Sequence, residues 1–395
     1  MNKERVLLIM LASLQFTNII DFMIMMPLGK QIMELFRIET SQFGVVVASY
    51  TLSAWASGMV ASLFLDKFDR KSSLLFTYSG FITGTFLCAL APNYELLVGA
   101  RILTGIFGGI LGAQVLAIVA DTVPFERRGT AMGIIMAAFS LASALGVPIG
   151  IFIAKHWNWQ MPFIVIGSLA FIIWIIAFFV LPSMRAHLQN VKKESPFLLY
   201  KTAFTNKYQR NGLLMMIIMM FGHFMIVPNV ATYLQYNVEF SEESLMWVYL
   251  CGGIISIYSN PLAGRLADKH GKEKIFIVFV LLTTLPVFLI THLGVVPVYV
   301  AVGITTLFFA FSGGRFSPAQ ALISETVNPQ HRGSFMSFVS AMQQLGAGLG
   351  ALIAGIIMST GPDKKIQGFN VVGYVAIGVT LCSLFFIHRI RPPKA

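Results

Sequence analysis

The sequence predicts an all-helical membrane protein, with twelve transmembrane helices arranged in two pseudo-symmetric six-helix bundles. Three observations predict this fold: an excess of apolar residues, a regular succession of long apolar segments, and a repeat between the two halves of the chain. Of the 395 residues, 56% are hydrophobic and only 11% are charged, whereas soluble domains carry about 25% charged residues. The surplus of apolar side chains is larger than a soluble core buries. The composition therefore excludes an ordinary soluble enzyme.

A helix needs about 20 mostly apolar residues to cross the hydrocarbon core of a bilayer. Lys3 and Arg5 precede the first apolar run as in a secretory signal peptide, but no small-residue cleavage site follows them, and the run continues to Pro27 as a full-length helix. The predicted spans are 6–29, 41–65, 73–91, 96–120, 130–154, 160–181, 211–236, 244–267, 275–292, 295–323, 334–359 and 367–387. They leave no room for a large domain outside the membrane.

The distribution of basic residues predicts the orientation, because cytoplasmic loops carry an excess of Lys and Arg. Most of the 28 Lys and Arg residues fall on the side of the two termini, which we therefore expect in the cytoplasm, in a bacterial inner membrane. The net charge of +11 then reflects topology, and we expect no nucleic-acid partner. The opposite side holds only Lys30, Arg37, Lys155, Lys364 and Lys365.

Two polar segments occur once in each half of the chain. The segment Asp66–Lys71 after the second span corresponds to Asp268–Lys272 after the eighth, and Asp121–Met132 after the fourth corresponds to Glu325–Met336 after the tenth. Matched spacing and topological position indicate an internal repeat. We predict an N-terminal bundle of residues 1–181, a cytoplasmic linker of residues 182–210 and a C-terminal bundle of residues 211–395. Two such bundles face each other across a cavity in rocker-type secondary transporters.

Several motifs resemble those of the major facilitator superfamily over essentially the whole chain. The loop Gly264-Arg-Leu-Ala-Asp268-Lys-His-Gly271-Lys272 resembles the signature loop of the superfamily. Arg101-Ile-Leu-Thr-Gly105, with the glycines that follow, resembles its fourth-span motif. Gly146-Val-Pro148-Ile-Gly150 resembles the antiporter motif of the drug/proton antiporter branch, with Val147 inserted between the glycine and the proline. The proline and the glycines of this motif also predict a kink and close helix packing.

The resemblance implies that the first, fourth, seventh and tenth spans line the cavity, and that a charge network at the cytoplasmic face latches the outward-facing state. Such exposed pairs are each worth about 0 to 1 kcal/mol, so they can break and re-form. Asp69 stands where the pattern of the first-half loop favours glycine. The predicted gate residues are Asp66, Arg70 and Asp121 in the first half and Arg265, Asp268, Lys272 and Glu325 in the second.

Only Asp21, Arg101 and Arg315 lie well inside the spans, and a charge there costs at least about 2.5 to 3.5 kcal/mol on insertion scales. Asp21 and Arg101 lie at comparable depth, so an ion pair that faces the cavity is expected. Two interpretations of Asp21 stay open: a permanent salt bridge, or a carboxyl that carries the coupling proton, which we favour.

The internal repeat places Asp21 and His223 at matched positions on the first and seventh spans. Because histidine titrates near neutrality, we expect these two residues to face one cavity and at least one of them to carry the proton. Arg315 either binds an anionic group of the substrate or extends to the cytoplasmic interface, and the extended or a purely structural role is slightly favoured over anion binding. The predicted cavity residues are Asp21, Phe22, Met25, Arg101, Gln114, His223, Asn229, Tyr233, Arg315, Gln320 and Gln343.

Together these patterns predict a proton-coupled exporter of small lipophilic or amphipathic compounds that works by alternating access. A symporter, facilitator or lipid transporter on the same fold stays open, because a few cavity residues set substrate and direction. A membrane enzyme is disfavoured, because the sequence has no H-E-x-x-H or G-x-S-x-G motif. It also has no G-x-x-x-x-G-K-[ST] loop for ATP. We expect a monomer without metal or cofactor, driven by a proton gradient.

Overall fold

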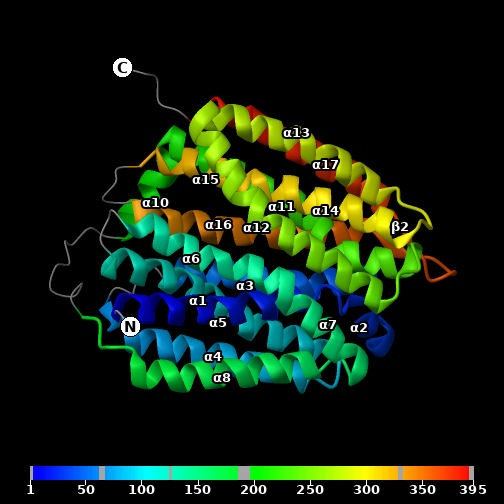
Figure 1. The fold of residues 1–395 in the computed structure, drawn as a ribbon, viewed down its shortest axis with the longest axis horizontal. Coiled ribbons are helices and arrows are strands. Elements are labelled where there is room, and N and C mark those ends of the chain that lie inside the picture. Colours follow the sequence, from blue (N-terminus) through cyan, green and yellow to red (C-terminus); the bar gives the residue numbers. More distant parts are fainter. Residues whose placement is uncertain (1–2, 62–66, 124–126, 186–195, 328–331, 391–395) are drawn as a thin grey trace.

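The computed structural model describes residues 3–390 except 62–66, 124–126, 186–195 and 328–331. Its long helices lie side by side in a single bundle (Figure 1). Helix α1 (Lys3–Ile24) begins and helix α17 (Phe369–Ile387) ends at one end of the bundle, which we call the terminal end. The opposite end holds the short helix α2 (Gly29–Phe36) and a two-stranded hairpin of β1 (Ser359–Thr360) and β2 (Ile366–Gln367), and we call it the hairpin end.

Twelve helices of the described chain are long and apolar enough to cross a membrane, which confirms the predicted number of spans. Each half of the chain supplies six of them. The first half contains, after α1, the helices α3 (Thr40–Ala61), α4 (Arg70–Ala89), α5 (Tyr94–Thr122), α6 (Arg128–Leu141) continued by α7 (Val147–His156), and α8 (Met161–Val180). The second half contains, before α17, the helices α11 (Lys207–Asn237), α12 (Glu242–His270), α13 (Lys272–Thr291), α14 (Val298–Gly314) continued by α15 (Phe316–Ser324), and α16 (Arg332–Ile357).

The observed helices differ from the predicted spans at three places. Helix α1 ends at Ile24, and the residues up to Pro27 leave it through a turn that leads into α2. The tenth span is broken at Arg315, between α14 and α15. Within the predicted linker, residues Pro196–Thr205 form helix α10, and α11 begins at Lys207.

The motif at 146–150 lies where the fifth span changes its helix type. Residues Ala142–Gly146 form a π-helical turn between α6 and α7. Pro148 is the second residue of α7, and proline cannot donate a backbone hydrogen bond in a helix interior. A Cβ atom at Gly146 or Gly150 would lie 2.4 Å from a side-chain carbon of Ile20 or Ile24, respectively. The two glycines therefore let this span pack directly against α1.

The largest apolar cluster of the described residues spans both halves and lies toward the hairpin end. It contains Met25 and Phe43 of the first half together with Phe224 and Ala351 of the second. Toward the terminal end, one cluster is built from first-half helices and another from second-half helices, with Trp55 and Met59 of α3 packed against the latter. The two halves are therefore joined most firmly at the hairpin end.

Helices α3 and α16 form the largest contact between the halves. At the hairpin end their backbones approach closely: a Cβ atom at Gly44 would lie 3.0 Å from the carbonyl oxygen of Ala351 and 3.2 Å from the Cα of Gly355. Small residues permit this approach of helices in a membrane. On the other side of the interface, α12 packs against α7 and the π-helical turn.

Candidate functional site: a buried ion pair and an aromatic bridge

Asp21 lies in the last turn of α1 and is completely buried. Its Oδ2 atom accepts a hydrogen bond of 2.8 Å from Nη1 of Arg101 on α5, whose side chain is also completely buried. Although α1 ends three residues later, Met25 and Met26 in the following turn are 1% exposed and cover this end of the helix. The two charges that the sequence places at one depth therefore form an ion pair in the protein interior.

Residues from two further helices complete the surroundings of this pair. Thr85 of α4 donates a hydrogen bond of 3.0 Å to Oδ1 of Asp21. The guanidinium carbon of Arg101 lies 4.5 Å from the ring centre of Tyr50 on α3, and the Tyr50 hydroxyl donates to Oδ1 of Asn18 at 2.7 Å. Nε and Nη2 of Arg101 have no hydrogen-bond partner in the described part of the chain. Arg101 therefore has donors to spare for a second acceptor.

Sequence reasoning missed Thr85 and Tyr50. Neither belongs to a motif, and both are uncharged residues in apolar helices, so insertion cost gives no reason to select them. The one available signal is their depth in the membrane, since Tyr50 lies within the second predicted span and Thr85 within the third. Depth alone does not say which face of a helix meets Asp21.

Aromatic rings continue from the ion pair across the interface between the halves. Tyr50 stacks on Phe22 of α1 with ring centres 4.9 Å apart, and Phe22 meets Phe224 of α11 at 5.8 Å. Phe224 in turn contacts its neighbour His223 at 5.6 Å. We call the contact of Phe22 with Phe224 the aromatic bridge. It joins the two halves beside the buried ion pair.

His223 lies in a pocket of aromatic rings in the second half. Its ring stacks on Phe308 of α14 at 5.7 Å and meets the edge of Phe316 of α15 at 5.6 Å. Its Nδ1 atom is buried and has no hydrogen-bond partner among the described residues. Asp21 and His223 occupy matched positions, but they do not contact each other, and their chain neighbours Phe22 and Phe224 meet instead.

Arg315 lies at the break between α14 and α15, and its side chain is 1% exposed. Nε and Nη1 have no hydrogen-bond partner in the described part of the chain. The guanidinium carbon lies 5.9 Å from the ring centre of Phe316. The side chain therefore stays inside the protein, which disfavours its extension to the membrane interface.

The neutral polar residues predicted to line the cavity mostly have partners inside the protein. Nε2 of Gln114 donates to Oγ of Ser73 at 2.6 Å. Nδ2 of Asn229 donates to the carbonyl of Met225 on its own helix at 3.0 Å. Gln320 of α15 and Gln343 of α16 are partly buried. Gln114 and Asn229 thus donate hydrogen bonds within their own halves.

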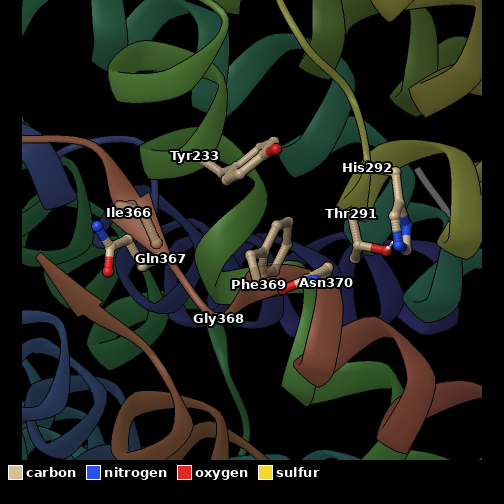
Figure 2. Close-up of a pocket in the computed structure, with 8 residues that line it drawn as sticks. All are labelled: Tyr233, Thr291, His292, Ile366, Gln367, Gly368, Phe369 and Asn370. Carbon is tan, nitrogen blue, oxygen red and sulfur yellow. Dashed lines mark hydrogen bonds between the residues drawn. The ribbon is translucent and has the colours of Figure 1, made fainter. Parts of the chain in front are cut away.

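Tyr233 lies near the hairpin end of α11 and contributes to a different cavity. This cavity has a volume of about 250 Å³ and is shown in Figure 2. The Tyr233 hydroxyl donates to the carbonyl of Leu293 at 2.8 Å, and His292 lies within hydrogen-bond distance of the Tyr374 hydroxyl, at 2.9 Å. The residues that line it are Tyr233, Thr291, His292, Ile366, Gln367, Gly368, Phe369 and Asn370.

A smaller cavity of about 70 Å³ lies between the halves. Gln15 of α1, Gly112 of α5 and Ile135 of α6 line it from the first half, and Ser340 of α16 lines it from the second. Oε1 of Gln15 is buried and has no hydrogen-bond partner in the described chain. The cavity lies toward the terminal end, where the apolar cores of the two halves are separate.

Two of the predicted gate pairs are present at the terminal end, and each lies within one half. Nε of Arg70 donates to Oδ2 of Asp121 at 2.9 Å, so the pair joins α4 to α5. Lys272 pairs with Glu325, which joins α13 to the end of α15. The remaining predicted gate residues are Arg265 and Asp268, which are exposed, and Asp66, which lies outside the described residues.

Asp69 binds the start of the linker at the same end. It accepts hydrogen bonds from the hydroxyl of Ser183 at 2.5 Å and from the backbone N–H of Met184 at 3.1 Å, and it pairs with Arg185 at 3.2 Å. It also caps α4 by accepting from the N–H of Lys71. Desolvation raises the pKa of Asp69, but these hydrogen bonds lower it more, and the pKa falls to about 2. The residue that departs from the glycine pattern thus has a structural role.

The hairpin end is held by polar contacts between the halves. Gln31 donates to Glu242 at 2.5 Å, and Lys155 of α7 pairs with Glu243 of α12. The hydroxyl of Thr40 donates to the carbonyl of Met358 at 3.0 Å. These contacts and the shared core close the hairpin end in this conformation.

Comparison with known proteins agrees with this architecture. The family model of the major facilitator superfamily matches residues 11–227 and 212–395. The chain is 25% identical over 369 residues to the Bacillus subtilis protein named "Uncharacterized MFS-type transporter YceJ", with 92% of each chain covered. It is 24% identical over 361 residues to a "Probable sugar efflux transporter" of Helicobacter pylori strain G27, covering 90% of this chain and 87% of that protein.

Solved structures show the same fold. A bacterial homologue of the human lysosomal transporter Spinster, in an inward-facing and occupied conformation, matches with a TM-score of 0.78 at 13% identity over 98% of this chain and 97% of that one. A D-xylose-proton symporter matches with a TM-score of 0.77 at 15% identity over 98% of both chains. With its family motifs, its two halves of six helices and these matches, the chain is an integral multi-pass membrane transporter and belongs to the major facilitator superfamily.

Proposed function

We propose that this transporter is a proton-coupled exporter of small amphipathic compounds in a bacterial inner membrane, with its terminal end in the cytoplasm. The observation that supports it most directly is the buried ion pair of Asp21 and Arg101. Asp21 is the only acidic side chain among the described residues that is buried in the protein. A titratable group inside a membrane is costly and typically belongs to an ion or proton pathway.

The surroundings of the pair support a switch. Protonation of Asp21 removes the charge that neutralises Arg101, so the guanidinium must find another acceptor. Nε and Nη2 of Arg101, which have no partner among the described residues, can donate to such an acceptor. Until an acceptor binds, the ring of Tyr50 stabilises the cation. Proton uptake at Asp21 and substrate contacts elsewhere at the interface then favour different arrangements of the two halves.

The interface chemistry supports an amphipathic substrate. Phe22 and Phe224 lie between the halves, and flexible Met25 and Met26 lie next to them. Methionine and aromatic side chains adapt to varied apolar ligands. Nε2 of Gln114 and Nδ2 of Asn229 already donate hydrogen bonds inside the protein, so they are less available to the hydroxyl groups of a sugar. We therefore favour an amphipathic compound over the sugar suggested by the name of the Helicobacter relative.

The conformation is consistent with the export cycle. The halves share a core at the hairpin end and have separate cores toward the terminal end. With the terminal end in the cytoplasm, as the excess of basic residues predicts, this state is closed to the outside. A substrate would then enter from the cytoplasmic side.

The proposal is tested by transport in proteoliposomes. Naphthyl compounds of different charge are loaded on one side, a pH gradient is imposed, and proton movement is followed with a pH-sensitive dye. We expect compound and proton to move in opposite directions in the wild type. In the double variant Asp21→Asn, Arg101→Gln, which removes both charges together, we expect transport that no longer responds to the gradient. Movement in the same direction would establish a symporter, and gradient-dependent transport by the double variant would exclude Asp21 as the proton carrier.

A further inference from the structure

Among the residues that the structure describes, Arg315 is a buried cation without a counter-ion. It is 1% exposed, and no carboxylate of the described residues pairs with it. The sequence explains the absence of a resident partner, because the acidic residues of the second half lie in loops or near helix ends, from Glu239 to Asp363. Glu325, ten positions further along the chain, pairs with Lys272 instead.

The first half shows how this protein neutralises a buried arginine internally. Arg101 is as completely buried in its own half, and there Asp21 accepts from it at 2.8 Å. An unpaired ion in a protein interior costs several kcal/mol, and pairing offsets much of that cost. Arg315 follows the last turn of α14, whose negative end favours its charge, but it also precedes the first turn of α15, whose positive end opposes it, and each end contributes only about 0.3 to 1 kcal/mol. The helix dipoles therefore do not replace a counter-ion.

A second unpartnered group lies beside Arg315. The rings of His223 and Phe316 are in contact, and Phe316 also lies next to the guanidinium of Arg315. Nδ1 of His223 is buried without a hydrogen-bond partner in the described chain, as are Nε and Nη1 of Arg315. Buried polar groups are almost always hydrogen-bonded in folded proteins. Two adjacent side chains with unsatisfied nitrogens therefore point to an acceptor that enters from outside the chain.

Apolar rings lie on the other side of the same cluster. His223 stacks on Phe308, and its neighbour Phe224 forms the aromatic bridge with Phe22 at the interface of the halves. A molecule whose polar head reaches Arg315 can therefore lay an apolar body along these rings. The cation suits the polar head of an amphipathic compound, and the aromatic rings suit its apolar body.

We propose that Arg315 binds an anionic head group of the substrate, a carboxylate or a phosphate monoester, with Nδ1 of His223 as a second polar contact. This inference rests on the proposed function and narrows its substrate class to amphipathic anions. Arginine suits such a group because it stays charged when buried and presents several donors. The transported anion then supplies the counter-ion that the described residues do not provide.

The test measures binding without any gradient, so that it is independent of proton coupling. Purified protein in nanodiscs is titrated with four probes that share one body: 2-naphthoate, 2-naphthyl phosphate, 2-naphthylmethanol and 2-naphthylmethylammonium. Dodecyl phosphate is a fifth probe, which separates a lipid-like anion from a soluble one. We expect the wild type to bind the anionic probes at least about tenfold more tightly than the neutral alcohol.

The variants assign this preference to one side chain. Arg315→Gln should lose the preference for anions, at least about tenfold in Kd, while its affinity for the alcohol stays unchanged. Arg315→Lys should retain part of the preference. Lys365→Gln is the matched control, because it removes one positive charge from an exposed position in the hairpin, and it should bind all probes as the wild type does.

Two results would overturn the inference: wild-type protein that binds the alcohol or the ammonium compound as tightly as the anions, or Arg315→Gln protein that keeps the anion preference. The first needs no variant, so the inference stays testable even if Arg315→Gln fails to fold. Anion binding that depends on Arg315 without proton-coupled transport would refute the proposed function alone. Proton-coupled transport that does not distinguish the probes by charge would refute this inference alone.

Discussion

Replacing Asp21 with asparagine should destabilise the protein strongly. The substitution leaves Arg101 completely buried, and Nε and Nη2 of its guanidinium already lack partners in the described chain. What remains is the ring of Tyr50, at 4.5 Å, a cation–π contact worth about 0.5 to 2 kcal/mol. Removing one member of a buried ion pair costs about 3 to 5 kcal/mol. The asparagine carbonyl can still accept from Nη1, so we expect a loss near the lower limit, about 3 kcal/mol.

The double variant Asp21→Asn, Arg101→Gln separates the charge from the packing. It removes both ions together, so no uncompensated charge stays buried; replacement of a whole buried pair by apolar residues is often neutral, and two amides that can hydrogen-bond each other avoid most of the cost of an unpaired ion. We therefore expect most of the loss to be recovered. Asp363→Asn is the matched control, because it makes the same chemical change at an exposed residue of the hairpin and should have little effect.

The measurement is the free energy of unfolding of purified protein in mixed micelles, from denaturant titrations followed by helix content. The reasoning is refuted if Asp21→Asn loses less than about 1 kcal/mol. It is also refuted if the double variant is at least as unstable as the single one. Either result would mean that the 2.8 Å contact does not neutralise Arg101 in the folded protein.

Three further predictions concern the two ends of the bundle. The pKa of Asp69 is lowered to about 2 from its ordinary value of 3.8. The ionised carboxylate therefore stabilises the start of the linker fully above about pH 4, and this stabilisation is lost as the pH falls toward 2. Limited proteolysis of the linker should increase over that range, and Asp69→Ala should show the increase already at neutral pH. Gly44→Val should push α3 away from α16 and so raise the labelling of a cysteine introduced at the hairpin end. Labelling equal to that of the same cysteine variant with Gly44 retained would contradict the close approach of the two helices. Glu243→Lys should place a second cation beside Lys155 and favour opening of the hairpin end. Adding Lys155→Glu should reverse the effect, and failure of the reversal would refute the pairing.

The sequence predicts most of this fold because membrane insertion depends on local composition. Twelve apolar segments of sufficient length give twelve helices, whatever their neighbours, because a lipid-exposed backbone must satisfy its own hydrogen bonds. The repeat predicts two bundles. The cost of charge in lipid identifies Asp21, Arg101 and Arg315 from their positions within the apolar segments alone. Depth along two helices then predicts that the first two can meet, and in the structure they do.

The same reasoning does not reach the contacts that depend on helix rotation. Thr85 and Tyr50 have no charge and no motif, so their contact with the ion pair follows only from the faces that α4 and α3 turn toward α1. The repeat matches Asp21 with His223, but the rings of Phe22 and Phe224 meet at that place. Spacing along one helix says nothing about which neighbour a side chain faces, because packing between helices sets that choice.

In this protein, the number of membrane spans, the two related halves and the three charges inside the membrane follow from the amino-acid sequence alone. These follow from the free energy of moving each segment from water into lipid, which depends on the segment alone. The three-dimensional packing, by contrast, gives Arg101 a partner and leaves Arg315 with none among the described residues. Pairing depends on how the helices are rotated and packed, and a buried charge is neutralised only by a group that reaches it in space.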